Sequence, residues 1–150
     1  DCLLSRGLGD VYKRQELYTG TCSWFNEGEF RMSQTNKATL ERANAAIVEG
    51  DYEGFLSACT DDTKWTFVGE QTLDGKEAVR QWMAQTYKEP PRFDVHRLVA
   101  EGDIVAAIGE ITLKDAAGKA THHSYCDVWR FRDGKLAELH AFVVETGEAA

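Results

Sequence analysis

Residues 119–145 read KATHHSYCDVWRFRDGKLAELHAFVVE and carry the clearest secondary-structure pattern of the chain. Apolar and polar side chains alternate on both sides of Asp133-Gly134, and an Asp-Gly pair between two alternating runs is typical of a tight β-hairpin. The pattern therefore predicts antiparallel strands over residues 119–132 and 135–145, joined by that two-residue turn.

Two further strands are predicted upstream of this hairpin. Residues 93–100 and 104–113 show no helical period, and Glu101-Gly102-Asp103 separates them as a turn. Residues 115–118, which read DAAG, separate the second of these strands from the hairpin. The carboxyl-terminal half is thus predicted to be a four-strand antiparallel meander.

The preceding part of the chain carries helical patterns instead. Asn36 can cap a helix that runs to about Glu49, where Gly50 ends it, and Asp51 can cap a second, short helix. The apolar residues of each segment recur at helical spacing, which predicts one buried face per helix. These residues are Leu40, Ala43 and Ile47 in the first helix, and Tyr52, Phe55, Leu56 and Cys59 in the second.

A third helix is predicted after a short strand over residues 63–68. Asp74 and Glu77 are spaced as a capping box, so the helix is expected to begin after Asp74. Pro90-Pro91 ends the segment that precedes it. Three helices followed by a meander predict an α+β fold, in which a strongly curved antiparallel sheet packs with one face on the helices. The buried side of the third helix is expected to be Ala78, Val79, Trp82 and Met83.

The composition excludes several classes of partner. The 150-residue chain has a formal net charge of −8 and no cluster of Lys and Arg, so neither nucleic acid nor an anionic membrane is expected to bind. No apolar run approaches the ~18 residues that span a bilayer. The four cysteines form no Cys-x-x-Cys pair, which gives no support to a zinc or redox motif and indicates free thiols in a reducing, cytoplasmic compartment. No cofactor is expected.

The first 31 residues do not share the pattern of the rest. Asp10-Val11-Tyr12-Lys13-Arg14-Gln15 resembles the translation of a transposase adaptor used to prepare sequencing libraries, and residues 1–15 as a whole are similar to such an adaptor. We therefore expect residues 1–31 to be a non-native leader, with Met32 as a natural start; the alternative is a genuine amino-terminal extension. The predicted domain is 32–146, followed by a tail at 147–150.

Four short motifs, in their order and spacing, resemble those of one family. They are Gly50-Asp51-Tyr52-Glu53-Gly54-Phe55, then Asp61-Asp62 before a strand, Gly75-Lys76-Glu77-Ala78-Val79-Arg80, and Asp127-Val128-Trp129-Arg130-Phe131-Arg132-Asp133-Gly134-Lys135. From about residue 36 to residue 146 the chain resembles the SnoaL-like and ketosteroid isomerase-like group of the nuclear transport factor 2-like superfamily. The resemblance implies a cone-shaped sheet that closes over an apolar pocket, and often a homodimer.

The resemblance also assigns positions to the best-known chemistry of the group. In ketosteroid isomerases an Asp base, a Tyr donor and a protonated Asp act together, and these positions fall at Phe67, Ala43 and Asp127 respectively. The acid that SnoaL-type cyclases place on the last strand falls at Ala141. Only Asp127 retains the functional residue type, so any mechanism here must differ from these two.

The strand that carries Asp127 offers further polar side chains. Side chains alternate between the two faces of a strand, so an inward Asp127 puts His123, Tyr125 and Trp129 on the pocket side. His123 is then a candidate base, and Asp127 and Tyr125 are candidate donors. Apolar surroundings such as Trp129 should raise the pKa of Asp127. The alternative is a hydrogen-bonded polar ladder inside an ordinary core.

The remaining positions of this strand face outward in the same prediction. His122 and His123 therefore cannot form a metal pair, and Ser124 with His123 cannot form a nucleophile–base pair, because neighbouring strand residues point to opposite faces. No metal site is predicted.

The rest of the pocket wall is predicted to be mainly aromatic and aliphatic. Glu110 interrupts the apolar run 104–113, and it faces either the pocket or the outer surface. The residues expected to contact a ligand are Trp65, Phe67, Trp82, Met83, Glu110, Trp129 and Leu139.

These features predict a small hydrophobic, carbonyl-bearing ligand held in an apolar pocket. The sequence leaves open whether the protein catalyses an isomerase, cyclase or dehydratase reaction by acid–base chemistry. The alternatives are a non-catalytic binder of the same ligand, and a dimeric interaction module whose pocket is filled by its own side chains. A cavity below about 300 Å³ would favour the interaction module.

Overall fold

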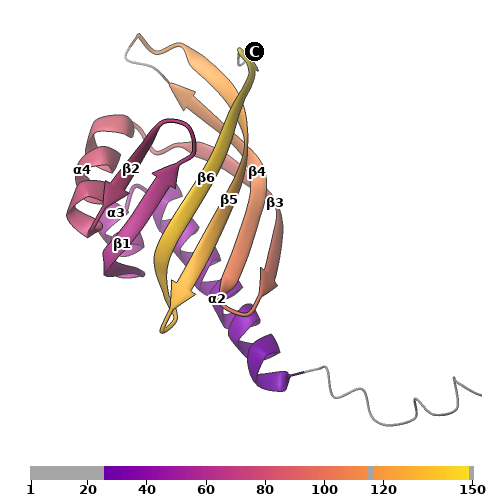
Figure 1. Cartoon of the computed structure of the whole chain (residues 1–150). Coiled ribbons are helices and arrows are strands. Elements are labelled where there is room, and N and C mark those ends of the chain that lie inside the picture. Colours follow the sequence, from indigo (N-terminus) through magenta and orange to yellow (C-terminus); the bar gives the residue numbers. More distant parts are fainter. Residues whose placement is uncertain (1–25, 115–116, 149–150) are drawn as a thin grey trace, which may run out of the picture.

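The computed structural model describes residues 26–114 and 117–148. Within these residues the chain forms three helices and a curved six-strand sheet, with the helices against one face of the sheet (Figure 1). None of these helices is long and apolar enough to cross a membrane. In chain order the elements are α2 (Glu27–Val48), α3 (Tyr52–Ser57), β1 (Cys59–Phe67), β2 (Gln71–Asp74), α4 (Lys76–Thr86), β3 (Arg92–Glu101), β4 (Ile104–Lys114), β5 (Ala120–Arg132) and β6 (Lys135–Glu148).

The sheet is mixed, which corrects the prediction of a purely antiparallel sheet. Its strand order is β2-β1-β6-β5-β4-β3, and every neighbouring pair is antiparallel except β1 and β6. β6 returns from the end of the meander and lies parallel to β1, so the first and the last strand of the chain are neighbours. Alternation along a single strand carries no information about the direction of its partner, and the sequence pattern therefore missed this pairing.

The predicted hairpin is confirmed. Arg132 pairs with Lys135 across a turn in which Asp133 and Gly134 have φ angles of 51° and 73°. Positive φ at both central residues is the type I′ geometry, whose twist matches that of the two strands. Glycine adopts this backbone region without steric cost, and aspartate tolerates it better than most residues.

One extra residue in β6 shifts the register of this hairpin. Phe131 pairs with Leu136, but Arg130 pairs with Glu138, so Ala137 is left unpaired as a β-bulge. The consecutive residues Leu136 and Ala137 are both buried, which marks the point where the alternation restarts. Beyond the bulge, the odd-numbered residues of β6 face the helices.

The bulge decides which side chains of β6 lie beside β5. Asp127 is opposite Ala141, whereas a ladder that continued the register of the turn would place His140 there. As predicted, Leu139 is buried on the helix side and His140 is exposed on the outer side. The inner face of the sheet is therefore apolar around Asp127.

Helix α2 begins earlier than predicted. The N-cap is Asn26, not Asn36: the Oδ1 atom of Asn26 accepts hydrogen bonds from the N–H groups of Gly28 and Glu29. Asn36 lies in the middle of the helix and is 2% exposed, because it falls on the buried face. Residues 27–31, predicted to belong to a leader, are part of this helix, whereas residues 1–25 lie outside the described residues.

The two shorter helices begin differently from each other. Asp51 caps α3 as predicted, with its Oδ1 accepting from the Gly54 N–H at 2.8 Å. Asp74 does not cap α4, because it ends β2 and forms an ion pair with Lys64 of β1 at 3.5 Å. Gly75, at a φ of 87°, precedes α4 without a side-chain capping bond. The sequence missed β2, since four residues are too few to show an alternating pattern.

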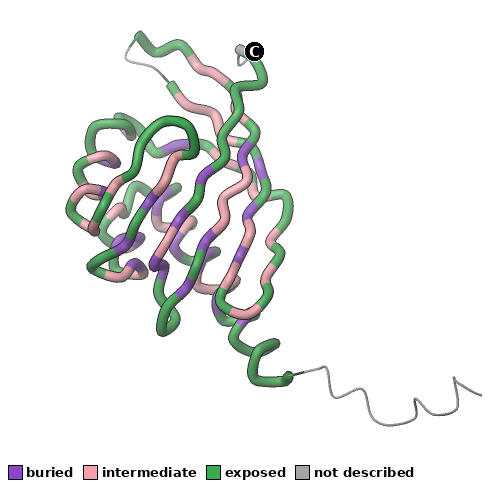
Figure 2. The backbone as a smooth tube through the Cα atoms, viewed as in Figure 1, coloured by how far each residue is buried: buried purple, intermediate pink, exposed green. Residues whose placement is uncertain are grey.

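Buried side chains gather between the helices and the sheet. Figure 2 shows buried positions alternating with more exposed ones along the central strands. At the centre of the core, the Trp65 ring meets those of Phe55 and Trp129 edge to face, with centroids 5.6 Å and 5.5 Å away. Each such pair contributes about 0.5–1.5 kcal/mol beyond the burial of area. This aromatic group anchors α3 to β1 and β5.

Gly109 of β4 leaves room for the ring of Tyr125, and we expect Gly109→Ala to destabilise the protein. A Cβ at this position would lie 2.1 Å from the Asp94 carbonyl oxygen and 2.7 Å from Tyr125 Oη. Overpacking of this kind lowers the free energy of unfolding by about 1–3 kcal/mol, which urea denaturation measures. The control is Glu110→Ala, which lies on the exposed outer face of the same strand and adds no atom to the core. An unchanged unfolding midpoint for Gly109→Ala would contradict this account.

Candidate functional site

A cavity of about 330 Å³ lies between the inner face of the sheet and the helices. This volume is at the low end of the range for small-molecule sites, which is about 300–1,000 Å³. The cavity is not filled by the side chains around it, and most of its wall is apolar. Its aromatic lining residues are Phe55, Trp65, Phe67, Trp82, Tyr87, Phe93, Tyr125 and Trp129.

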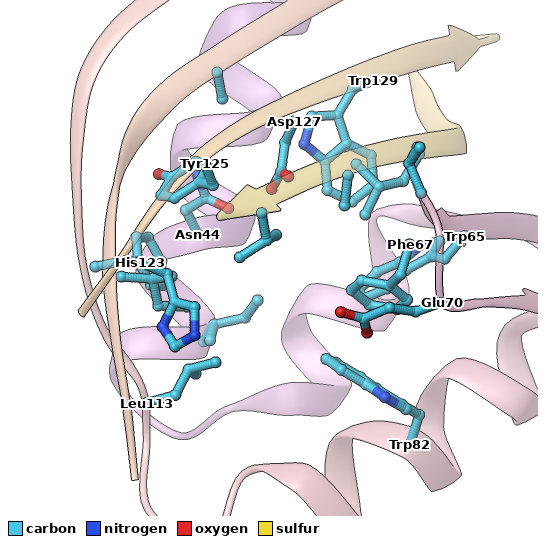
Figure 3. Close-up of a pocket in the computed structure, with 18 of the residues that line it drawn as sticks. Asn44, Trp65, Phe67, Glu70, Trp82, Leu113, His123, Tyr125, Asp127 and Trp129 are labelled. Atoms are coloured by element: carbon cyan, nitrogen blue, oxygen red, sulfur yellow. The ribbon is translucent and has the colours of Figure 1, made fainter. Parts of the chain in front are cut away.

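The structure places the three predicted polar residues of β5 on the cavity wall. His123, Tyr125 and Asp127 all line the cavity, because they alternate along one face of the strand (Figure 3). His122 and Ser124 are exposed on the opposite face of the sheet. The three polar residues nevertheless differ in what their functional atoms can reach.

Asp127 has no polar neighbour on either adjacent strand. It lies opposite Ala107 of β4 and Ala141 of β6, and these short side chains leave open space over the carboxyl group. Figure 3 shows this group directed into the cavity. Its Oδ1 atom is buried and has no hydrogen-bond partner in the described part of the chain. Burial raises the pKa of Asp127 to about 7, because water is kept from the charged form.

Tyr125 contributes its ring to the wall, but its hydroxyl group points elsewhere. Tyr125 Oη lies beside Gly109, and Figure 3 shows it directed away from Asp127. Burial raises the pKa of Tyr125 to about 12, and the charges of Asp127 and Asp94 add to this effect. Tyr125 is therefore a neutral phenol at physiological pH, and its orientation does not support the predicted role as a donor beside Asp127.

His123 lies some distance from Asp127 along the cavity. The two residues are four positions apart on β5, which corresponds to about 13 Å at the usual strand rise. Across the sheet His123 is opposite Glu145 of β6, and both residues line the cavity. His123 Nδ1 is buried without a hydrogen-bond partner among the residues described. His123 and Asp127 therefore line different parts of the cavity wall.

Two predicted ligand contacts lie outside the cavity. Glu110 is exposed on the outer face, because the inward residues of β4 are the odd-numbered ones. Met83 is 1% exposed in the core and does not line the cavity; its neighbour Trp82 does, since successive helical residues point about 100° apart. The other predicted contacts, Trp65, Phe67, Trp82, Trp129 and Leu139, all line the cavity.

Several cavity residues were not predicted. Tyr87 follows α4 and is part of the wall, where burial and the charge of Asp127 raise the pKa of its hydroxyl group above the usual value. Glu70 comes from the turn between β1 and β2, and Asn44 comes from α2. Asn44 lies three positions before Ile47 on the predicted buried face, and Tyr87 lies four positions after Met83, so helical spacing could have found both. Glu70 lies in a turn, which shows no periodicity.

Three polar atoms in the wall are buried without a partner in the described part of the chain. They are Trp65 Nε1, His123 Nδ1 and Asp127 Oδ1. Buried polar groups in folded proteins are nearly always hydrogen-bonded, so these three atoms are available to water or to a ligand that enters the cavity. Within residues 26–114 and 117–148, no three His, Cys, Asp or Glu side chains gather to hold a metal ion.

The outer face of the sheet is apolar near its centre. Phe142 and Ile108 are 46% and 41% exposed, and both lie beside Cys126 of the intervening strand. An exposed apolar patch that crosses several strands is typical of an interaction surface. The residues of this outer apolar patch are Val99, Ala106, Ile108, Cys126, Val128, Phe142 and Val144.

Residues 40–139 match the family model of the SnoaL-like domain. Among solved structures, an NTF2-like protein of unknown function from Burkholderia pseudomallei has a TM-score of 0.67 and 19% identity, covering 73% of this chain and 91% of that one. An LEH-like epoxide hydrolase from M. tuberculosis has a TM-score of 0.68 and 17% identity, covering 75% and 84%. TerC, co-crystallized with polyporic acid, has a TM-score of 0.65 and 19% identity, covering 73% and 92%. No curated protein matches the chain. At these identities the structures establish the NTF2-like fold alone.

We expect the Asp127 carboxyl group to titrate near pH 7 and to make stability depend on pH. An unfolded Asp titrates near ~3.9, so between about pH 4 and 7 the folded chain keeps a proton that the unfolded chain has lost. The free energy of unfolding, relative to that of Asp127→Asn, should therefore fall as the pH rises through this window, and level off above it. NMR titration of the carboxyl carbon and urea denaturation at several pH values measure the two effects. A titration at the ordinary Asp value would contradict this account.

Proposed function

The chain belongs to the SnoaL-like family, and we propose that it binds a small hydrophobic molecule whose oxygen accepts a hydrogen bond from protonated Asp127. One observation carries the proposal: a buried carboxyl oxygen without a partner faces an apolar cavity of ligand size. A neutral carboxylic acid can donate to a carbonyl oxygen, whereas a carboxylate cannot. With a pKa of about 7, Asp127 is protonated in about half of the molecules at neutral pH.

The chemistry that we propose for this site is general acid catalysis at the bound oxygen. Proton donation by Asp127 to a carbonyl, lactone or epoxide oxygen draws electrons from the adjacent carbon, which assists isomerisation, cyclisation and dehydration alike. Two similar structures support a small-molecule role, since one is an epoxide hydrolase and the other, TerC, was co-crystallized with polyporic acid. His123 would contact the far end of an elongated ligand, about 13 Å from Asp127 along the strand.

Non-catalytic binding is the second candidate, and a specific observation favours it. The residues opposite Asp127 on both neighbouring strands are Ala107 and Ala141, so neither strand offers a base beside the acid. Binding needs only the cavity and the donor, whereas proton abstraction next to the bound oxygen needs a further group. An interaction module with a filled pocket is disfavoured by the cavity volume of about 330 Å³.

We also propose that the protein is a homodimer formed through the outer apolar patch. The patch lies on the face of the sheet opposite the helices, and its members Phe142 and Val144 are 46% and 64% exposed. Burying such side chains against a second copy removes apolar surface from water, which contributes a favourable free energy of about 25 cal/mol per Å².

We also propose a cytoplasmic location. The described cysteines, Cys59 and Cys126, are free thiols, which supports this location.

Substitution of Asp127 distinguishes catalysis from binding. Small ketones, lactones and epoxides are screened for binding by the fluorescence of the tryptophans in the wall, and for turnover by chromatography. If the protein is an enzyme, Asp127→Asn should lower kcat by at least about 100-fold, which is the lower end of the effect of a general acid. The Asn amide still donates a hydrogen bond, so ligand binding should be retained in Asp127→Asn and lost in Asp127→Leu.

The controls for this experiment come from the same chain. Glu110→Gln removes an acid from the outer face and should change neither binding nor turnover. Binding in the wild type without any turnover would identify a non-catalytic binding protein. Equal binding by wild type and Asp127→Leu would refute the proposed role of Asp127.

The proposed dimer is tested by charge substitutions on exposed apolar residues. Phe142→Glu places a charge within the outer apolar patch, and we expect it to weaken dimerisation by at least about tenfold, because the charge would lose its hydration in the interface. Val48→Glu, at an equally exposed position on α2, is the control and should leave the dimer intact. Sedimentation equilibrium measures both. A wild-type protein that stays monomeric would overturn the proposal.

A further inference from the structure

We propose that the oxygen bound by Asp127 lies within the carbon skeleton of the ligand, on a ring or a branched carbon, and that Ala107 and Ala141 determine this specificity. This inference rests on the proposed function, namely that Asp127 donates to an oxygen of a small hydrophobic molecule, and it names the class of that molecule. Cyclic ketones, lactones and secondary alcohols belong to this class, whereas aldehydes and primary alcohols carry their oxygen at the end of a chain.

Three neighbouring residues form a low row across the inner face of the sheet. Ala107 of β4 and Ala141 of β6 are both opposite Asp127 of β5, so the three residues lie side by side on adjacent strands. These three residues, the alanine row, all line the cavity. Adjacent strands are about 4.8 Å apart, which separates the Cα atoms of the two alanines by about 10 Å. Their methyl groups leave space on both sides of the carboxyl group as well as over it.

Larger side chains close the alanine row at both of its ends. Phe67 of β1 is opposite Ala141, and Leu98 of β3 is opposite Ala107. Phe67 and Leu98 both pack against the buried core, so their side chains lie on the helix side of the sheet. The space beside Asp127 is therefore bounded, and it extends about one strand spacing to each side of the carboxyl group.

Large side chains also border the alanine row along the strand direction. On one side, Trp129 of β5 is opposite Leu139 of β6. On the other side, Tyr125 stands beside Gly109, and its ring occupies the space that the glycine leaves. Figure 3 shows Asp127 between Tyr125 and Trp129, with its carboxyl group directed into the open space. The alanine row is therefore a local depression in the inner face of the sheet.

This depression is enclosed within the molecule. Ala107 and Ala141 are 2% and 3% exposed, so the space over them belongs to the cavity and not to the outer surface. The Oδ1 atom of Asp127 is buried and has no hydrogen-bond partner among the described residues. Enclosed apolar space that stays empty costs its lining atoms their dispersion contacts, so a ligand that fills the depression is favoured over one that leaves it empty.

The position of the oxygen in a ligand decides how well that ligand fills the alanine row. A ligand with a terminal oxygen directs the end of its chain at Asp127 and leaves the space over both alanines empty. A ligand whose oxygen lies on a ring or a branched carbon places carbon atoms over Ala107 and Ala141, while its oxygen meets the carboxyl group. Each further CH₂ group that is buried in this way strengthens binding about fourfold.

The test compares two isomeric alcohols, racemic 1-phenylpentan-3-ol and 5-phenylpentan-1-ol, which differ only in the position of the oxygen. Binding to the full chain is measured by calorimetry at pH 6, where Asp127, with a pKa of about 7, is mostly protonated. We expect the secondary alcohol to bind at least about fourfold more tightly than the primary alcohol, which is the effect of one further buried CH₂ group.

Matched substitutions of alanine locate the specificity. Ala107→Leu and Ala141→Leu each fill one side of the alanine row, and each should weaken binding of the secondary alcohol by at least about tenfold and that of the primary alcohol by less than about threefold. Ala106→Leu adds the same side chain to the outer face of β4 and should change neither affinity. Circular dichroism checks that each variant is folded, and the smaller Ala107→Val and Ala141→Val serve where a leucine variant is not.

The outcomes separate the inference from the proposed function. Equal affinities of the wild type for the two alcohols, or equal losses of both in the variants of Ala107 and Ala141, overturn the inference. The proposed function stands in that case, provided that Asp127→Leu abolishes binding of both alcohols. If neither alcohol binds to the wild type, both fail.

Discussion

β6 carries one more residue than β5 between the Asp133-Gly134 turn and the cavity, and that residue, Ala137, fixes which side chains surround Asp127. Side chains alternate with a period of two, so a shift of one residue exchanges the inner and outer faces of a whole strand. Without the bulge, His140 would replace Ala141 beside Asp127. Together with Ala107 on the other neighbouring strand, this local irregularity leaves the buried carboxyl group of Asp127 between two short apolar side chains.

The sequence predicts the regular parts of this fold well, because their signals are local. The stripe Leu40, Ala43 and Ile47 locates α2, and the Asp133-Gly134 turn locates the hairpin. Three features were missed because their local signal is weak or absent. The parallel pairing of β1 with β6 joins distant segments, and β2 is too short to show alternation. The start of α2 depends on the Asn26 cap of a segment in which no helical spacing of apolar residues was recognised.

The candidate site also combines features that local sequence patterns predict with features that they do not. Alternation along β5 correctly brings His123, Tyr125 and Asp127 to the cavity wall. Alternation does not reveal that the hydroxyl group of Tyr125 lies beside Gly109 and points away from Asp127, because this orientation depends on contacts between strands. Glu70 lies in a turn, where neither period applies, and its place in the cavity wall became visible only with the fold. Of the three acidic residues that line the cavity, Asp127 and Glu145 lie on strands predicted from the sequence, and Glu70 does not.

The parallel contact between β1 and β6 also sets the order in which the chain can mature. β1 leaves the ribosome long before its partner, and only the short β2 is available to pair with it in the meantime. Closure of the sheet around the aromatic residues of β1 must wait for the last strand to be synthesised. Contacts between segments so distant in sequence slow folding and leave an apolar strand edge exposed to other chains. A nascent chain of this protein therefore cannot complete its sheet before its carboxyl-terminal strand has been synthesised.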